Sequence, residues 1–154
     1  MADRLDFWMQ CAAQAASQSK DRSRKIGCVI VDRRDVAISM GWNGFPRRVN
    51  DNVEARHMRP LKYKWTEHAE RNAIYNAAAR GASTLGCTIY LPWFPCSDCA
   101  RAIIQSGIER LVCVPCEPSD EQWHADMAEA EIMLREAGVQ IDVVEGREAP
   151  KAAC

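Results

Sequence analysis

The chain has 154 residues, of which 47% are hydrophobic and 27% are charged, and its formal net charge is −1. This composition predicts one α/β domain over residues 1–145 and a flexible tail over 146–154. The near-neutral charge argues against nucleic acid and anionic membranes as partners, and no apolar run reaches the roughly 18 residues of a membrane span. Because most of the eight cysteines lie in apolar runs, we expect reduced thiols and a cytoplasmic protein.

The predicted elements alternate between helices and apolar strands, a pattern that places the strands in one sheet. The chain opens with an amphipathic helix whose apolar face carries Leu5, Trp8, Met9, Ala12 and Ala15 or Ala16. Strands at 26–31 and 36–40 and an irregular loop over about 43–64 come next. An Ala-rich helix over 67–80 follows, with Thr66 as its N-cap and Gly81 after its end.

The second half of the chain repeats this alternation. The predicted elements are a strand at 87–91, a helix at 97–106 closed by Gly107, a strand at 111–114, a long helix and a strand at 139–144. The long helix has one apolar stripe, formed by Trp123, Met127, Ala130, Leu134 and Ala137.

Three residues with metal-binding side chains stand at two predicted helix starts. His68 offers an imidazole, and Cys96 and Cys99 offer two thiolates, which the positive end of a helix favours. Three protein ligands leave a tetrahedral zinc ion one open position for water, as in catalytic sites. Glu70 suits the role of proton carrier beside the metal better than that of a fourth ligand. The spacing H-x-E…P-C-x-x-C resembles that of the zinc nucleobase deaminases.

Other interpretations of these cysteines remain open. A Cys-x-x-Cys pair alone also suits a redox pair or a buried packing pair, and a structural zinc also uses Cys and His. A structural zinc normally has four protein ligands, and no fourth accompanies the trio. Cys113 and Cys116 form a second such pair without a nearby histidine, and His57 lies in the loop without a cysteine. A second metal at either place is therefore left open.

Several segments resemble the deoxycytidylate deaminase family over about residues 5–144. They are 19–21 (SKD), 27–31 (GCVIV), 41–48 (GWNGFPRR), 68–74 (HAERNAI), 95–100 (PCSDCA) and 105–108 (QSGI). The resemblance implies a three-layer cytidine deaminase-like fold, with a five-stranded mixed sheet flanked by helices, and a homo-oligomer. It also implies conversion of deoxycytidine monophosphate (dCMP) to dUMP, and it assigns Asn43 to the sugar or base.

The chain departs from the family pattern in three places, at Arg48, at Arg24 and in the segment 92–94. Arg48 stands where the family usually has glycine, and arginine tolerates a positive φ poorly. Arg24 stands where threonine is common. Trp93 and Phe94 replace a small, polar approach to the metal, so Trp93 would stack on the base, narrow the pocket or pack against a neighbouring subunit.

The candidate substrate-binding residues follow from these observations. A phosphate needs local guanidinium groups, and the candidates are Arg47 and Arg48 in the loop and Arg22 and Arg24 after the first helix. The remaining candidates for contacts with the substrate are Asn43, Ala69, Trp93 and Phe94.

Other functions remain as alternatives to a nucleotide deaminase. A deaminase of a modified ring, nucleoside or free base fits the unusual Trp93. Editing of tRNA would favour a basic protein, whereas the isoelectric point is near 6.3. A zinc module without activity would leave Glu70 unexplained.

Overall fold

Five strands form one mixed sheet in the computed structural model, which describes residues 4–115 and 121–144. The strand order is β2-β1-β3-β4-β5. Strand β1 (Gly27–Val31) pairs antiparallel with β2 (Ala37–Trp42) and with β3 (Thr88–Leu91), whereas β3, β4 (Arg110–Cys113) and β5 (Gln140–Val143) are parallel. The predicted five-stranded mixed sheet is confirmed.

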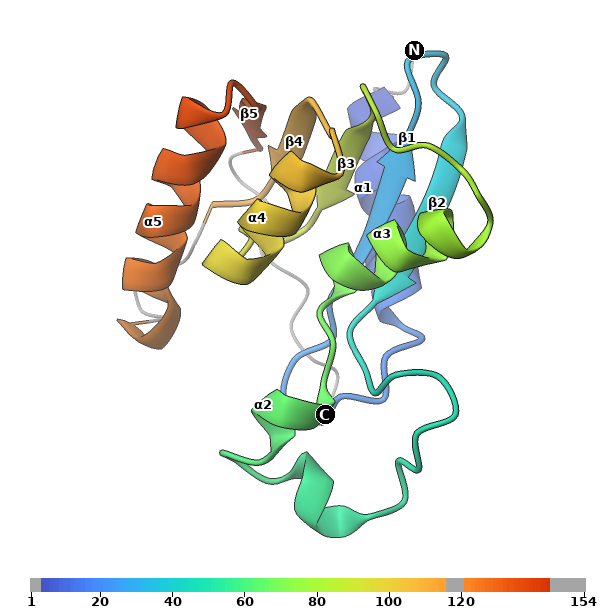
Figure 1. The fold of residues 1–154 in the computed structure, drawn as a ribbon, viewed down its shortest axis with the longest axis vertical. Helices are drawn as coiled ribbons and strands as arrows, with labels where there is room; N and C mark the ends of the chain where they lie inside the picture. Colours follow the sequence, from blue (N-terminus) through green and yellow to red (C-terminus); the bar gives the residue numbers. More distant parts are fainter. Residues whose placement is uncertain (1–3, 116–120, 145–154) are drawn as a thin grey trace.

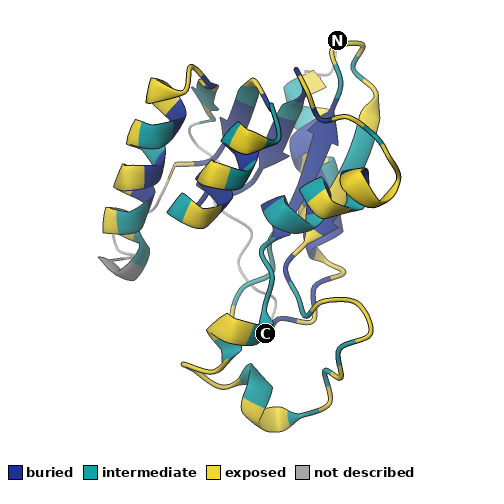
Figure 2. Ribbon diagram, in the orientation of Figure 1, coloured by how far each residue is buried: buried dark blue, intermediate teal, exposed yellow. Residues whose placement is uncertain are grey.

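Helices cover both faces of the sheet, which gives the three predicted layers (Figure 1). Helix α1 (Arg4–Ala16) lies on one face, and α3 (Ala69–Ala79), α4 (Ser97–Gln105) and α5 (Glu121–Glu136) lie side by side on the other. Figure 2 shows that the central strands β1, β3 and β4 are almost wholly buried, that the edge strands β2 and β5 are only partly buried, and that the exposed parts of each helix face outward. The tail 146–154 lies outside the described residues, and the domain boundary stays a prediction.

Two apolar layers hold the sheet between these helices. Beneath α1, Trp8 and Met9 pack with Val29 of β1. On the opposite face, Leu91, Ile103 and Leu134 belong to the larger core cluster, each with at most 2% of its surface exposed. The predicted apolar faces of the first and last helices are confirmed except at Ala137, which follows the end of α5 and is exposed.

The loop after β2 contains more structure than predicted. It includes a 3₁₀-helix, η1 (Glu54–His57), and one helical turn, α2 (Lys62–Trp65), and it projects from one end of the sheet (Figure 1). Its aromatic rings pack on one another, with the centroids of Phe45 and His57 4.8 Å apart and those of Phe45 and Trp65 6.4 Å apart. No helix within the described residues has the length and apolar character needed to cross a bilayer.

Helix α3 begins two residues later than predicted, and Thr66 is not its N-cap. The N-cap is His68, in an extended conformation with φ −81° and ψ 156°. The reason lies in Glu67, whose backbone N–H and C=O both pair with Gly44, at 2.8 and 3.0 Å. These bonds hold the chain extended up to residue 67, so the helix can only start beyond it.

Strand β2 and the first turns of α3 approach each other closely at Gly41. A Cβ atom there would lie 2.4 Å from the carbonyl oxygen of Ala69 and 2.4 Å from the backbone nitrogen of Ala73. Both neighbours are backbone atoms and cannot move aside alone. Glycine at this position therefore sets the distance of α3 from the sheet.

Replacing Gly41 by alanine should displace α3 and destabilise the protein. Overpacking typically costs about 1–3 kcal/mol, and we expect at least about 2 kcal/mol because the clash is with backbone. Denaturant unfolding of Gly41→Ala measures the loss. Gly44→Ala is the matched control, because a Cβ there meets nothing within 4 Å. Equal stability of the two variants would contradict this explanation.

Candidate functional site

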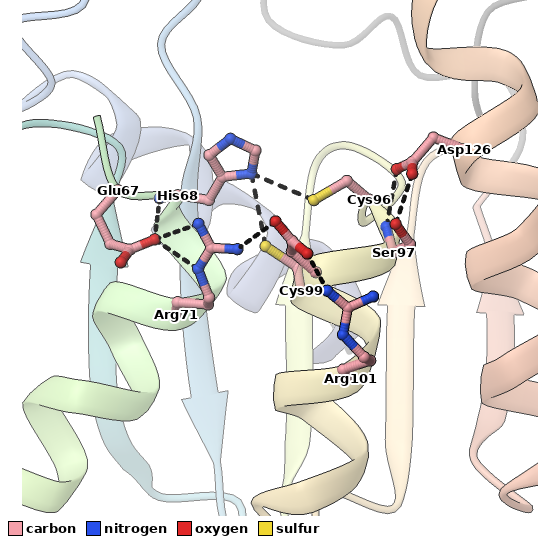
Figure 3. Close-up of polar contacts among 9 residues, drawn as sticks. Glu67, His68, Arg71, Cys96, Ser97, Cys99, Arg101 and Asp126 are labelled. Atoms are coloured by element: carbon pink, nitrogen blue, oxygen red, sulfur yellow. Dashed lines mark hydrogen bonds and ion pairs between the residues drawn. The ribbon is translucent and has the colours of Figure 1, made fainter. Parts of the chain in front are cut away.

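The three predicted metal ligands lie together where two helix N-termini meet (Figure 3). The Nδ1 atom of His68 is 3.4 Å from Sγ of Cys96 and 3.5 Å from Sγ of Cys99. All three ligand atoms lie within 4.8 Å of one another. Among the described residues, this is the one group of three or more His, Cys, Asp and Glu side chains placed to hold a metal ion.

The helix caps explain how two separate segments supply these ligands. His68 and Cys96 are the N-cap residues of α3 and α4, and neither side chain caps its own helix. An N-cap residue has extended φ and ψ angles, so its side chain can leave the helix end. Here both side chains point toward each other instead (Figure 3).

The geometry of the trio fits a tetrahedral zinc ion. With Zn–N bonds of about 2.1 Å and Zn–S bonds of about 2.3 Å, tetrahedral angles place the nitrogen and sulfur atoms about 3.6 Å apart. The two observed distances, 3.4 and 3.5 Å, are close to this value. Imidazole and thiolate are also the ligands that zinc prefers, so both the chemistry and the spacing of the site suit this ion.

The thiols of Cys96 and Cys99 interact strongly with each other and with His68 in the absence of a metal. Hydrogen bonds with Cys99 and His68 lower the pKa of Cys96 to about 4, although burial opposes the shift. The same bond with Cys96, together with burial, raises the pKa of Cys99. One thiolate is therefore present at neutral pH, and binding of a divalent cation would release a proton from Cys99.

Glu70 lies two residues beyond His68 and is 4% exposed. Burial raises the pKa of its carboxyl above the ordinary glutamate value, while the charge of His68 opposes the shift. A carboxyl with a raised pKa holds a proton more readily than an ordinary glutamate, which suits a group that must accept and then donate a proton. Ala69, between these two residues, is fully buried, and its carbonyl accepts a hydrogen bond from the Cys28 thiol.

Polar residues that the sequence analysis missed surround the ligands (Figure 3). Arg71 forms ion pairs with Glu67 and with Asp98. On the other side, the carboxylate of Asp126 accepts hydrogen bonds from the backbone N–H and the hydroxyl of Ser97, at 2.8 and 2.5 Å. Asp126 thereby caps α4 from α5. Of these contacts, only the Glu67–Arg71 ion pair could have been recognised in the sequence, because opposite charges four residues apart pair on a helix.

An aromatic residue of α5 also reaches the site. The ring of Trp123 makes edge-on contacts with His68 and with Tyr63 of α2, each at a centroid distance of 6.3 Å. The predicted apolar stripe of the last helix therefore ends in a residue that touches a ligand.

A pocket of about 250 Å³ lies between the loop after α1 and the loop after β2. Its lining contains five basic side chains and two acidic ones. The basic residues are Lys20, Arg22, Arg47, Arg48 and Lys62, and the acidic residues are Asp21 and Asp51. Asn43 and Thr66 also line it, whereas the three ligands do not.

Three consecutive residues hold the projecting loop to the body of the protein. Lys20 pairs with Asp51 at 2.8 Å, Asp21 with Lys62 at 2.7 Å, and Arg22 with Glu54 at 2.6 Å. The Asp21–Lys62 pair is buried, with 4% and 12% of the side chains exposed. Asp21 also accepts hydrogen bonds from the backbone N–H groups of Ser23 and Arg24.

The four candidate phosphate-binding arginines have different environments. Arg47 bonds to the side-chain oxygen of Asn76, and Arg22 is engaged with Glu54. Arg48 has φ 66°, so the turn keeps the left-handed conformation expected for the usual glycine. Its side chain pairs with no carboxylate in the part of the chain that is described. Arg24 does not line the pocket; its guanidinium lies 4.0 Å from the ring centroid of Trp93.

The other predicted substrate contacts are partly occupied within the chain. The side-chain oxygen of Asn43 accepts a hydrogen bond from the N–H of Ile26, and its amide group donates to the carbonyl of Arg24, each at 2.8 Å. Trp93 and Phe94 are 8% and 6% exposed and belong to the larger core cluster. Substrate contacts by these residues stay predictions.

The two possible second metal sites gain no support from the described residues. The Nε2 atom of His57 is 2.6 Å from the carbonyl oxygen of Asp51, and its ring stacks on Phe45. Cys113 is buried at the end of β4, and burial raises the pKa of its thiol to about 12. Cys116 lies outside the described residues.

Known proteins resemble this chain along most of its length. Residues 3–115 match the family described as "Cytidine and deoxycytidylate deaminase zinc-binding region". The deoxycytidylate deaminase of Mus musculus is 32% identical over 87% of this chain and 75% of its own length, and that of Enterobacteria phage T2 is 32% identical over 86% and 88%. The dCMP deaminase of cyanophage S-TIM5, solved with dCMP and dUMP, has the same fold, with a TM-score of 0.76 at 21% identity, covering 94% of this chain and 98% of its own.

Breaking the buried Asp21–Lys62 pair should destabilise the protein strongly. Removing one partner of a buried ion pair leaves an uncompensated charge and typically costs about 3–5 kcal/mol, so we expect about 3 kcal/mol for Lys62→Met. The double variant Asp21→Asn/Lys62→Met should lose less than the sum of the single losses. Denaturant unfolding gives these values, and Arg22→Gln, at an exposed pair, should change stability little.

The pH dependence of stability gives a second measure of this pair. Burial alone would raise the pKa of Asp21, but hydrogen bonds with Lys62 and with backbone N–H groups lower it below its ordinary value. A lowered folded-state pKa stabilises the protein above the unfolded-state value of about 4, and this contribution disappears as the pH falls further. Asp21→Asn should therefore flatten the loss of stability below about pH 4. If Asp21→Asn loses stability below about pH 4 as steeply as the unmodified protein does, the assignment is contradicted.

Proposed function

The chain belongs to the cytidine and deoxycytidylate deaminase family, whose members are zinc-dependent hydrolytic deaminases, and we propose that it converts dCMP and water to dUMP and ammonia. The proposed zinc ligands are His68, Cys96 and Cys99, and the proposed catalytic residue is Glu70. The observation that carries this assignment is a trio with zinc-like spacing beside a buried carboxyl.

The reaction needs a nucleophile and a proton carrier. When bound, zinc supplies the nucleophile by lowering the pKa of water toward neutrality. Glu70 accepts a proton from the attacking water and delivers it to N3 of the cytosine ring, while the oxygen bonds to C4. Glu70 then takes the second proton from the hydroxyl now on C4 and passes it to the amino group, so that the C4 carbonyl forms, the C4–N bond breaks and ammonia leaves. Proton transfer of this kind contributes about 10²- to 10⁴-fold to the rate.

The 5′-phosphate is proposed to bind in the pocket beside the projecting loop. Five basic side chains line this pocket, as do Asn43 and Thr66, and Thr66 lies just before His68 in the sequence. We assign the phosphate to Arg47 and Arg48, because neither is paired with a carboxylate among the described residues, whereas Arg22 is. A guanidinium group can bind two phosphate oxygens at once.

The cellular setting is proposed from the cysteines and the surface. All six cysteines of the described residues are free, which suits a reducing compartment such as the cytoplasm.

Exposed apolar side chains gather at the edge strand β2, where Met40 is 46% and Trp42 37% exposed, and on α3 beside it, where Tyr75 is 48% exposed. We propose this surface as a contact between copies in a homo-oligomer. An isoelectric point near 6.3 fits a small nucleotide better than nucleic acid.

Glu70→Gln should retain one zinc per chain and the native fold but lose essentially all turnover. The amide preserves the shape of the side chain and cannot carry the proton. Metal analysis and an ammonia-release assay with dCMP measure the two properties. Cys99→Ala should lose its zinc in parallel. If Glu70→Gln loses the metal as well, Glu70 is a ligand and its proposed role is wrong.

The intact enzyme should prefer dCMP to deoxycytidine by about 10- to 100-fold in kcat/KM. A charge-assisted contact with phosphate is worth about 1.5–3 kcal/mol, and about 1.4 kcal/mol corresponds to a tenfold change. Arg48→Gly should reduce this preference without a loss of stability, because glycine tolerates the φ of 66°.

Arg80→Ala is the matched control for this substitution, since Arg80 is exposed and outside the pocket. It should retain the full preference. Equal rates on dCMP and deoxycytidine in the unmodified enzyme would refute recognition of the phosphate and favour a nucleoside or free-base deaminase.

A further inference from the structure

The two ligand-bearing segments are separated by 28 residues in the sequence, so their spacing depends on contacts between α3 and α4. His68 precedes the first turn of α3, and Cys96 and Cys99 lie at the start of α4. A shift of either helix tip would change the distances between imidazole and sulfur directly.

One side chain connects the two tips. Arg71, in the first turn of α3, forms an ion pair with Glu67, whose carboxylate also accepts a hydrogen bond from the N–H of His68 at 3.0 Å. The same guanidinium forms a second ion pair, at 3.5 Å, with Asp98. Glu67 is adjacent to His68, and Asp98 is adjacent to Cys99. Arg71 thus joins the neighbour of one ligand to the neighbour of another (Figure 3).

Arg71 itself is better shielded from water than an ordinary surface arginine, although its partner Asp98 is 60% exposed. The side chain of Arg71 is 19% exposed and that of Glu67 is 23% exposed, so water screens their interaction weakly. Arginine also offers donors in several directions, whereas the ammonium of lysine is a single point of charge.

A second arginine provides an internal comparison. Arg101 also pairs with Asp98, but it belongs to α4 itself and its side chain is 58% exposed. Its ion pair therefore lies within one helix and does not connect α4 to α3. The two arginines share a partner and a charge, and they differ in whether they bridge the ligand-bearing segments.

We propose that Arg71 is a positioning residue, which holds His68 and the two cysteines at zinc-binding distance before the metal binds. This inference rests on the proposed ligand set. Residues next to metal ligands typically affect metal affinity by about 10- to 100-fold when they are removed. The contribution of Arg71 is the ion-pair bridge, so it should disappear with the guanidinium.

The test compares zinc affinity among purified variants by competition with a chromophoric chelator. Arg71→Met should bind zinc about 10- to 100-fold more weakly and release it faster, whereas Arg101→Met should stay within about twofold of the unmodified protein. Arg71→Lys should recover part of the affinity, because it restores the charge but not both contacts. Urea unfolding of the metal-free forms establishes that each variant is folded during the measurement.

Asp98→Asn gives an independent test if Arg71→Met does not fold. Asp98 is 60% exposed, and its replacement removes the link to α4 while Glu67 and Arg71 stay paired. Its zinc affinity should fall below that of Arg101→Met. Unchanged affinity in Arg71→Met or in Asp98→Asn, or an equal fall in Arg101→Met, would overturn the proposal. If the Cys99→Ala variant retains its zinc, the proposed ligand set itself is wrong. This outcome is distinct from a failure of the proposal for Arg71 alone.

Discussion

The site depends on one constraint: the N-cap positions of two helices must supply metal ligands instead of capping their helices. His68 and Cys96 leave the ends of α3 and α4 without a cap from their own side chains. Backbone N–H groups at a helix start need partners, and other segments provide them here. Glu67 accepts from the N–H of His68, and Asp126 accepts from that of Ser97. The polar residues around the ligands thus complete the helices as well as the site.

The same constraint explains why the fold holds the two helix tips so closely. Gly41 lets α3 approach the sheet, and the parallel strand β3 ends directly before α4, so both tips meet at the carboxyl end of that strand. Glu70 is carried into this place by α3 and is buried there. The proposed zinc ligands and the proposed acid–base residue are therefore placed by the packing of α3 and α4 against the sheet.

The sequence predicted the four long helices, the sheet and the clustering of His68, Cys96 and Cys99, because each has a local pattern. Apolar periodicity located α1 and α5, and the short spacings His68-x-Glu70 and Cys96-x-x-Cys99 located the trio. The start of α3 was predicted wrongly, since Thr66 is a good N-cap by residue type but its neighbour Glu67 pairs with Gly44, more than 20 residues away. Backbone pairing between distant residues produces no periodic pattern of side chains in the sequence.

The pocket could not be predicted for a similar reason. Its ion pairs join residues 20–22 to residues 51–62, and no motif connects charges at such a separation. Arg22 and Arg24 were candidates because of their residue type and their place after the first helix. In the structure, Arg22 is paired with Glu54, and Arg24 lies over the ring of Trp93. Lys62, which lines the pocket, carried no signal in the sequence, and Lys20 stood out only as part of the family-like segment 19–21.

The attachment of the projecting loop has a consequence for how such an enzyme can change over evolution. The loop carries its own aromatic cluster and is held to the body by three ion pairs from consecutive residues. Substitutions within it can alter the shape and charge of the pocket while the sheet and the two helix tips stay intact. If the pocket holds the phosphate as proposed, selectivity and chemistry are encoded in different stretches of the chain, so new substrates can be acquired without rebuilding the catalytic centre.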